Sequence, residues 1–504
     1  MEEIKKEAII EISASKIVLS VYEKRQNALY NIIEEYSEKI DLAEEILTQN
    51  LIRPVVIKSL MKIMKSYRKI CDNFGVAEVY CLMPNYFTMA KNIKSINEEI
   101  YNVCGISVII LSTDEQTRSL FCGAVNTTDL IKGMYFHVGE FESHFVQFNR
   151  RNVLNSAILP FGYYTFSKLK AEASAEECEK YLDDFKEAIL KLNFLFKEEG
   201  EIQLLTNGEI FANVGALARK ATKYPLDITL NYVTDMETFN NVYNLVANLD
   251  LDKTKKLKGL KDVSAEKFSA ALDLANVAIK VLNPTQISIS DENLREGYLD
   301  FYAMPEVFDR PLSDMFIYSL NVINEFYKIP NSNNEKVYDL AINVYKQLKV
   351  IHKLPRDYIK ALRVAAFMYD CGKRISQTDY IKNGFDIILH SRIKGVSQKD
   401  LLLAAFACKL QDLENLNLTE WVRYSSILTE DDLEAVKKIG IIVKIASDLD
   451  CTKMSVVDDL SCDILGDSII MKTIVNKDAS YEINEAMKIN PSFKKVFVKF
   501  IEII

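Results

Sequence analysis

Histidine, tryptophan, glycine and proline are scarce in this chain of 504 residues, which has 4 His, 1 Trp, 16 Gly and 10 Pro. Because the imidazoles are so few, a metal site built from several histidines is nearly excluded. The low glycine and proline content argues against long flexible linkers. The charged fraction of 26% and the hydrophobic fraction of 49% are typical of a folded protein and exclude wholesale disorder.

Cysteine shows no paired pattern: the nine residues are scattered, odd in number and never spaced as CxxC. This usage indicates a reduced, cytoplasmic protein that uses cysteine as a small core residue. The apolar run near the N-terminus is too short to span a membrane and lacks a small-residue cleavage site, so we expect no membrane partner. The net charge of −9 argues against a nucleic-acid coat protein, and we expect no specific nucleic-acid partner.

The first part of the chain alternates strand-like and helix-like runs. Ala8–Tyr22 predicts two strands around a turn at Ser13–Ser15, followed by a helix over 51–74 and a strand over Ala77–Met83. Further predictions are a helix at Tyr86–Val103, a strand at Ser107–Leu111 and a helix from Asp114 with Ser112 as its N-cap. Such alternation indicates an α/β layer fold.

The same pattern restarts at Met134–Val138 and Glu142–Phe148, with a turn at Gly139-Glu140. Predicted elements then follow: helix 175–198, strand 202–206, helix 208–220, helical residues 235–282 and strand Gln286–Ser290. Two α/β units that open alike predict a duplicated fold with a cleft between its halves. From about residue 304 the pattern becomes helical, after a candidate linker at 304–311. The predicted helices are 312–328, 333–353, 355–372 and 398–415, and the last 50 or so residues return to strand-like runs.

Several runs together resemble the exopolyphosphatase / guanosine pentaphosphatase (Ppx/GppA) family. Asn293–Gly297 is similar to the family's G-L-R-E-G, and Ser112–Arg118 to its S-G-x-E-E-A-R. Pro160 and Gly162 fit an S-x-P-L-G turn. In the helical part, Ala365–Lys373 resembles AALLHDIGK and Ala446–Cys451 resembles A-D-x-L-D-R.

The resemblance implies an architecture and a chemistry. The implied fold is α/β: two actin-like ATPase-fold (ribonuclease H-like) domains, then an all-α HD-like domain and a small α+β C-terminal domain. The implied boundaries are 1–126, 127–303, 304–440 and 441–504. The implied ligands are polyphosphate or a phosphorylated guanine nucleotide, with Mg²⁺ in an active form, and the implied assembly is a homodimer.

The three phosphate loops of the family are altered here. The first, D-x-G-S-N-S, reads Glu11-Ile12-Ser13-Ala14-Ser15-Lys16, and the second, D-x-G-G-G-S-T-E, reads His137–His144. The third, G-x-G-G-T, reads Leu205–Glu209. Carboxylates of Glu140, Glu142 and Glu209 therefore stand where a phosphate would arrive, and such like-charge contact is unfavourable.

The resemblance assigns roles to individual residues. Glu115 takes the place of the water-activating glutamate, unless the register is shifted by one and Gln116 stands there. Glu11 takes the metal position, and Arg118, Arg295 and Glu296 form the cleft wall. The implied phosphate-binding residues are Ser13, Ser15, Lys16, Gly139, Ser143 and Gly208. A weaker alternative is a new metal site made by His137 and His144 with Glu140 or Glu142.

The HD-like part lacks its metal ligands, because the expected His-Asp pair reads Tyr369-Asp370 and the later positions, in Asp379–Asn383, contain no histidine. Metal-dependent hydrolysis there is therefore not expected. Residues 353–400 carry ten Lys/Arg against five Asp/Glu, which suits an extended polyanion or, equally, solvated helix faces. The residues of this predicted polyanion strip are Lys353, Arg356, Lys360, Arg363, Lys373, Arg374 and Lys382.

Two functions follow. The chain is expected to be a Ppx/GppA-type phosphohydrolase with weak or no ordinary activity, in which Glu115 would activate water near a Mg²⁺ on Glu11. Alternatively it is an inactive pseudoenzyme, a scaffold that binds polyphosphate, a nucleotide or a protein.

Overall fold

The computed structural model describes residues 5–25, 29–196, 201–257, 260, 263–303, 314–327, 334–410 and 418–504. These residues fall into two compact units, unit 1 (Met1–Met315) and unit 2 (Phe316–Ile504). Among the described residues, no helix is long and apolar enough to cross a membrane.

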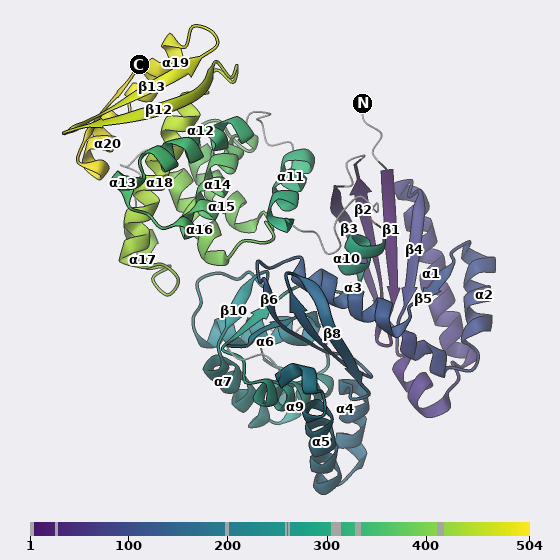
Figure 1. Ribbon diagram of the computed structural model, residues 1–504. Coiled ribbons are helices and arrows are strands. Elements are labelled where there is room, and N and C mark those ends of the chain that lie inside the picture. The colour runs from purple at the N-terminus through teal and green to yellow at the C-terminus, as the bar shows by residue number, and fades with distance from the viewer. Residues whose placement is uncertain are drawn as a thin grey trace. The chain divides into compact units, whose positions relative to one another are not determined.

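Unit 1 begins with a five-stranded sheet, the core of the first lobe (Figure 1). Its strands are β1 (Lys5–Ile12), β2 (Lys16–Lys24), β3 (Tyr30–Lys39), β4 (Glu78–Met83) and β5 (Val108–Ile110), in the order β3-β2-β1-β4-β5. β1 to β3 are antiparallel, and β4 and β5 run parallel to β1. The central β1 and β2 are buried over most of their length because both faces of the sheet are covered.

Helices cover this sheet through apolar stripes at helical spacing. In α1 (Pro54–Phe74) the buried side chains are Leu60, Met61, Met64, Tyr67 and Cys71, which share one face. α2 (Ile93–Cys104) packs beside α1, and short turns stand at η1 (Glu45–Gln49) and η2 (Asn85–Met89). The predicted N-cap at Ser112 is confirmed, since its hydroxyl accepts a hydrogen bond from the Glu115 amide at the start of α3 (Thr113–Val125).

The second lobe is built on a six-stranded sheet in the order β10-β11-β9-β6-β7-β8. Its strands are β6 (Lys132–Val138), β7 (Ser143–Asn149), β8 (Asn152–Leu159), β9 (Gln203–Thr206), β10 (Tyr232–Thr234) and β11 (Gln286–Ile289). β6 to β8 are antiparallel, while β9 is parallel to β6 and β11 to β9, which repeats the plan of the first sheet. The predicted duplication is therefore confirmed.

The helices of the second lobe are α4 (Tyr163–Glu172), α5 (Ala175–Leu190), α6 (Gly208–Ala221), α7 (Met236–Ala247), α8 (Leu251–Thr254) and α9 (Ala265–Leu282), with η3 at Asn193–Phe196. After β11, α10 (Leu294–Tyr298) and η4 (Leu299–Ala303) return to α3. A Cβ on Gly297 would lie 1.7 Å from the Ser119 carbonyl oxygen, so only glycine permits this approach. The contact of α3 with α10 fixes where Arg295 and Gln116 enter the cleft.

Unit 2 combines helices with a small sheet. The helices are α11 (Met315–Tyr327), α12 (Asn334–Gln347), α13 (Lys349–His352), α14 (Ile359–Met368), α15 (Tyr380–His390), α16 (Gln398–Lys409), α17 (Leu418–Val422) and α18 (Glu430–Asp448), with turns η5 (Arg356–Tyr358) and η6 (Cys371–Arg374). The sheet has the order β12-β13-β14, from β12 (Val457–Leu465), β13 (Ser468–Val475) and β14 (Phe500–Ile503), with α19 (Ser480–Met487) and α20 (Asn490–Phe497) between β13 and β14.

Several predicted bounds are corrected. The helix predicted at Tyr86–Val103 is a 3₁₀ turn followed by α2, and the helical stretch 235–282 is broken into α7, α8 and α9. Helix α18 runs across position 440/441, and the domain boundaries named from the sequence stay predictions. The candidate linker at 304–311 lies outside the described residues.

Candidate functional site

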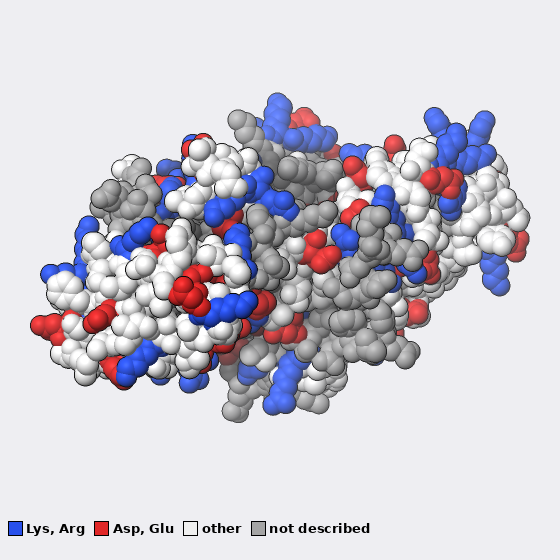
Figure 2. Space-filling view, turned by 90° about the horizontal axis from the view of Figure 1, so that it is seen from above, with Lys and Arg blue, Asp and Glu red and all other residues white. Residues whose placement is uncertain are grey.

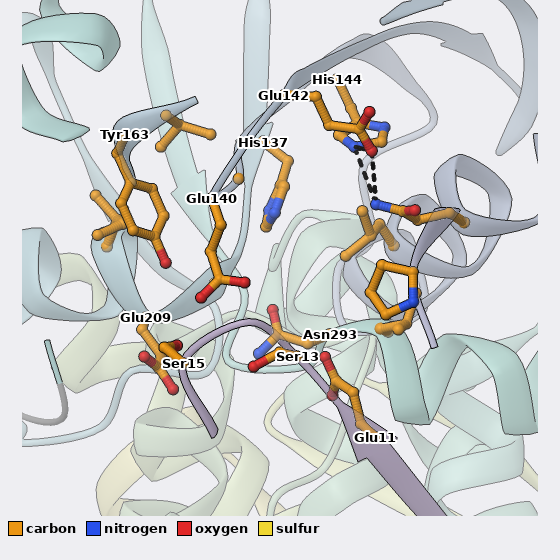
Figure 3. Close-up of a pocket in the computed structure, with 18 of the residues that line it drawn as sticks. Glu11, Ser13, Ser15, His137, Glu140, Glu142, His144, Tyr163, Glu209 and Asn293 are labelled. Carbon is orange, nitrogen blue, oxygen red and sulfur yellow. Dashed lines mark hydrogen bonds and ion pairs between the residues drawn. The ribbon is translucent and has the colours of Figure 1, made fainter. Parts of the chain in front are cut away.

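A cavity of about 140 Å³ lies in unit 1 where the loops of the two lobes meet (Figure 3). Its walls come from β1 and the turn after it, the start of α3, the β6–β7 turn and the starts of α6 and α10. The lining residues are Glu11, Ser13, Ser15, Lys16, Pro84, Tyr86, Gln116, Leu120, His137, Val138, Gly139, Glu140, Glu142, His144, Tyr163, Gly208, Glu209, Ile210, Asn293, Leu294 and Arg295.

Glu140 ties the second loop to the first. Its Oε2 accepts a hydrogen bond from the Ala14 backbone N–H at 3.0 Å and another from the Tyr86 hydroxyl at 2.8 Å. We call this contact the Glu140 bridge. Burial raises the pKa of Tyr86 well above its ordinary value, and the adjacent Glu140 carboxylate raises it further, so the phenol remains a donor.

Arg295 neutralises the carboxylates at the base of the cavity. Its Nη1 contacts Glu11 at 2.8 Å and its Nη2 contacts Glu35 at 3.1 Å. Burial lowers the pKa of Arg295, but the carboxylates of Glu296 and Glu11 outweigh it, so the net pKa lies above its ordinary value. The predicted metal position, Glu11, is thus engaged by a guanidinium through Oε2.

Lys16 reaches across to the third loop and forms an ion pair with Glu209. The ammonium group that could attract a phosphate is thereby engaged by a carboxylate of the other lobe. Gly208, the residue before Glu209, has φ +93°, a left-handed conformation that favours glycine. A Cβ at this position would lie 3.1 Å from the His137 ring.

The imidazole of His137 is held in one tautomer by Asn207. The Asn207 Nδ2 donates to the carbonyl oxygens of Leu120 and Glu292, at 3.1 and 3.0 Å, so its Oδ1 is the acceptor. That oxygen lies 2.8 Å from His137 Nδ1, which must therefore carry the proton. Burial lowers the pKa of His137 to about 4, and the neighbouring His144 lowers it as well.

Gln116 occupies the other wall with Glu142 and His144. Its Nε2 donates to Glu142 at 2.9 Å, and its Oε1 accepts from the Asn85 N–H at 3.1 Å. Burial raises the pKa of Glu142, but hydrogen bonds from His144 and Gln116 hold it below its ordinary range overall. His144 Nδ1 lies 2.9 Å from the Thr117 hydroxyl oxygen. That hydroxyl itself donates to the Thr113 carbonyl oxygen.

The structure brings together most of the residues named from the sequence. Glu11, Ser13, Ser15, Lys16, Gly139, Gly208 and Arg295 all line the cavity. Ser143 does not, because its hydroxyl donates to the Phe161 carbonyl at 2.7 Å. Arg118 is exposed and paired with Asp114 at 2.6 Å, and Glu296 accepts from the Asn293 N–H at 3.0 Å at the start of α10.

Glu115 also stays outside the cavity. Its carboxylate accepts from the Ser112 N–H at 2.7 Å and closes the capping box of α3. Gln116, the alternative in the shifted register, lines the cavity instead. Tyr86 and Tyr163 were not predicted as site residues, and Asn207 and Asn293 were named only within motifs, because the roles of all four depend on contacts between segments far apart in the chain.

No group of three or more His, Cys, Asp or Glu within the described part of the chain could hold a metal ion. This applies to His137 and His144 with Glu140 or Glu142, the alternative set named from the sequence. The alternative of a new histidine metal site is therefore not supported.

The predicted polyanion strip is partly engaged within unit 2. Arg363 pairs with Glu335 at 3.4 Å, Lys373 lies 3.9 Å from Asp370, and Lys360 donates to the Gly395 carbonyl. The other members, Lys353, Arg356, Arg374 and Lys382, are exposed. On the face that Figure 2 shows, basic and acidic side chains are interspersed over the described surface.

The family model for the Ppx/GppA phosphatase family matches residues 20–304. The chain is 23% identical over 323 residues to Retrograde regulation protein 2 of Saccharomyces cerevisiae, covering 57% of this chain and 55% of that protein. The chain thus spans about half the length of this curated relative.

Solved structures of the family share the fold. The Ppx/GppA family member of Aquifex aeolicus has 17% identity and a TM-score of 0.51, with 59% of this chain and 97% of that chain covered. An exopolyphosphatase from Cytophaga hutchinsonii ATCC 33406 has 16% identity and a TM-score of 0.53, with 58% and 96% covered. Unit 1 therefore has the two-lobed α/β fold of these structures, with duplicated sheets. The chain belongs to the Ppx/GppA phosphatase family.

Proposed function

We propose that this protein is a family member whose cleft does not carry out ordinary phosphoanhydride hydrolysis and that it acts by binding, as a regulatory protein or scaffold. The observation that carries the proposal is the Glu140 bridge, in which a carboxylate of the protein takes the Ala14 N–H that a phosphate would need. The curated relative from Saccharomyces cerevisiae is itself named as a regulation protein.

Electrostatics disfavours an anion in this cavity. Four glutamates line it, against one lysine and one arginine, and both cations are already paired with carboxylates. A unit anion 4 Å from one further carboxylate would be disfavoured by about 4 kcal/mol at an effective dielectric constant near 20. A polyphosphate end would meet several such contacts.

The predicted water-activating position carries no base that faces the cavity. Gln116 stands in the wall, and an amide does not take a proton from water at neutral pH. The adjacent Glu115 holds its carboxylate on the N-terminus of α3, outside the lining. Glu142 faces the cavity but accepts from Gln116 and contacts His144 at 3.3 Å.

A second candidate is exopolyphosphatase-type hydrolysis of polyphosphate or a phosphorylated guanine nucleotide. It is favoured by Lys16 and Arg295, which line the same cavity and would contact phosphate if Glu209 and Glu11 released them. Binding of such an anion would then require the Glu140 bridge to open. We further propose that the chain has an HD-like domain and a small C-terminal domain, forms a homodimer and is located in the cytoplasm.

Phosphate release separates the two candidates. The protein is incubated with polyphosphate or guanosine pentaphosphate and MgCl₂, and phosphate is measured over time beside the Gln116→Ala and Glu115→Gln variants. We expect no release above the buffer rate from any of them. Mg²⁺-dependent, saturable release by the unaltered protein would establish the hydrolase.

A further inference from the structure

The cavity presents hydrogen-bond acceptors that the protein leaves unused. Glu140 Oε1 is buried and has no hydrogen-bond partner among the described residues, although Oε2 of the same carboxylate has two. A buried carboxylate oxygen without a donor costs free energy, so a ligand that supplies one gains from it. Figure 3 shows this carboxylate pointing into the cavity below His137.

His137 supplies a second acceptor. Because Asn207 fixes the proton on Nδ1, the Nε2 atom of the neutral ring carries the lone pair, and the described residues give it no hydrogen-bond partner. A neutral ring is expected at physiological pH, since burial holds the pKa of His137 at about 4. Glu140 Oε1 and His137 Nε2 can therefore each accept a hydrogen bond from a ligand.

The remaining walls fit a small cation. The rings of Tyr86 and Tyr163 line the cavity, and Figure 3 shows Tyr163 beside Glu140. Aromatic faces attract ammonium groups. The Tyr86 ring is itself stacked on Phe87, so it offers apolar contact. Four glutamates against one lysine and one arginine leave an excess of negative charge. A volume of about 140 Å³ holds a molecule of roughly six heavy atoms, the size of benzene.

We propose that this cavity binds a small organic ammonium ion, whose N–H groups donate to Glu140 Oε1 and His137 Nε2 while its alkyl part lies against Tyr86 and Tyr163. The inference rests on the proposed function, because a cavity engaged in phosphate hydrolysis would hold an anion instead. Three N–H donors on one compact charge match acceptors that approach from different walls.

Calorimetric titration of the full-length protein with n-propylammonium chloride at pH 7.5 tests the proposal. Tetramethylammonium chloride carries the same charge without N–H donors, and KCl, MgCl₂ and sodium pyrophosphate are titrated in parallel. The variants are Glu140→Gln, which places an amide where the acceptor stands, and Glu176→Gln, an exposed glutamate on α5. Thermal unfolding of each variant shows that it is folded.

The expected result is saturable propylammonium binding that weakens at least about tenfold in Glu140→Gln, as for loss of a charge-assisted hydrogen bond. Binding should be unchanged in Glu176→Gln and absent with tetramethylammonium. No propylammonium binding, equal binding by Glu140→Gln, or an equal response to tetramethylammonium, K⁺ or Mg²⁺ would overturn the proposal, as would tighter binding of pyrophosphate. Phosphate release is measured separately, so failure of the ammonium site leaves the absence of hydrolysis intact.

Discussion

The carboxylate of Glu140 lies 3.0 Å from the backbone nitrogen of Ala14, so a side chain of the second lobe occupies an amide of the first. Free backbone N–H groups in tight turns bind phosphate in many folds. Here the amide is satisfied from within the chain. The cleft keeps the family architecture, and one of its own carboxylates accepts from this amide.

Removing this carboxylate should open the cleft to anions. In Glu140→Ala the Tyr86 hydroxyl loses its acceptor, the Ala14 N–H keeps only the Tyr86 oxygen at 3.1 Å, and one negative charge leaves the cavity. We expect tripolyphosphate to bind at least about tenfold more tightly than to the unaltered protein, as measured by calorimetry. Glu176→Ala, on the exposed face of α5, is the matched control and should change nothing. Equal affinity in both variants would show that Glu140 does not exclude anions.

Placing a carboxylate at position 116 in the cavity wall should destabilise the protein. In Gln116→Glu the new group would face Glu142, which the present amide contacts at 2.9 Å. Like charge and burial raise the folded-state pKa of the new carboxyl, so stability relative to the unaltered protein is lost as pH rises through that pKa. We expect unfolding free energy to fall by about 1–3 kcal/mol at pH 8 and by less at pH 5. Urea denaturation measures it, with exposed Gln347→Glu as the control.

His137 should give a distinct pH signature. Its pKa of about 4, against an ordinary 6.5, means that the unfolded chain binds a proton in this interval that the folded chain does not. The His137 contribution therefore destabilises the protein as pH falls from 6.5 to 4. With only four histidines, NMR can follow each ring, and His137 should titrate near pH 4. His137→Gln should reduce the acid destabilisation, whereas exposed His390→Gln should not.

Glu115 is expected to matter for the helix and not for the cavity. Its carboxylate caps α3 through Ser112, and glutamine can replace glutamate in a capping box. Glu115→Gln should therefore change the unfolding free energy by about 1 kcal/mol or less and leave propylammonium binding unaltered. Thermal unfolding and calorimetry check the two parts. A large loss of ligand binding in this variant would place Glu115 in the site.

Local patterns predicted much of the fold. The turn at Ser13–Ser15, the N-cap at Ser112 and the restart of the strand pattern near Met134 could be identified because each depends on neighbours in the chain. The edge strands β3 and β8 were not predicted, since their half-exposed residues carry little hydrophobic alternation. Residues 235–282 were predicted to be helical, but the caps at Asp250 and Ser264 that begin separate helices were not identified.

The site was predictable in its residues but not in its contacts. The acidic replacements at Glu140 and Glu209 were visible in the loops, yet their pairing with Ala14 and Lys16 depends on two lobes meeting. Likewise, whether Glu115 or Gln116 faces the cavity depends on how α3 is rotated about its axis. The close approach of Gly123 to Asn293 fixes this rotation. Sequence spacing alone could not decide it.

A crystal structure of the full-length protein grown with millimolar tripolyphosphate and MgCl₂ tests the central claim most directly. The account predicts that Glu140 Oε2 still accepts from the Ala14 N–H and that no phosphoryl group is ordered between the lobes. A phosphoryl oxygen bound to the Ala14 N–H, with Glu140 turned away, would contradict it.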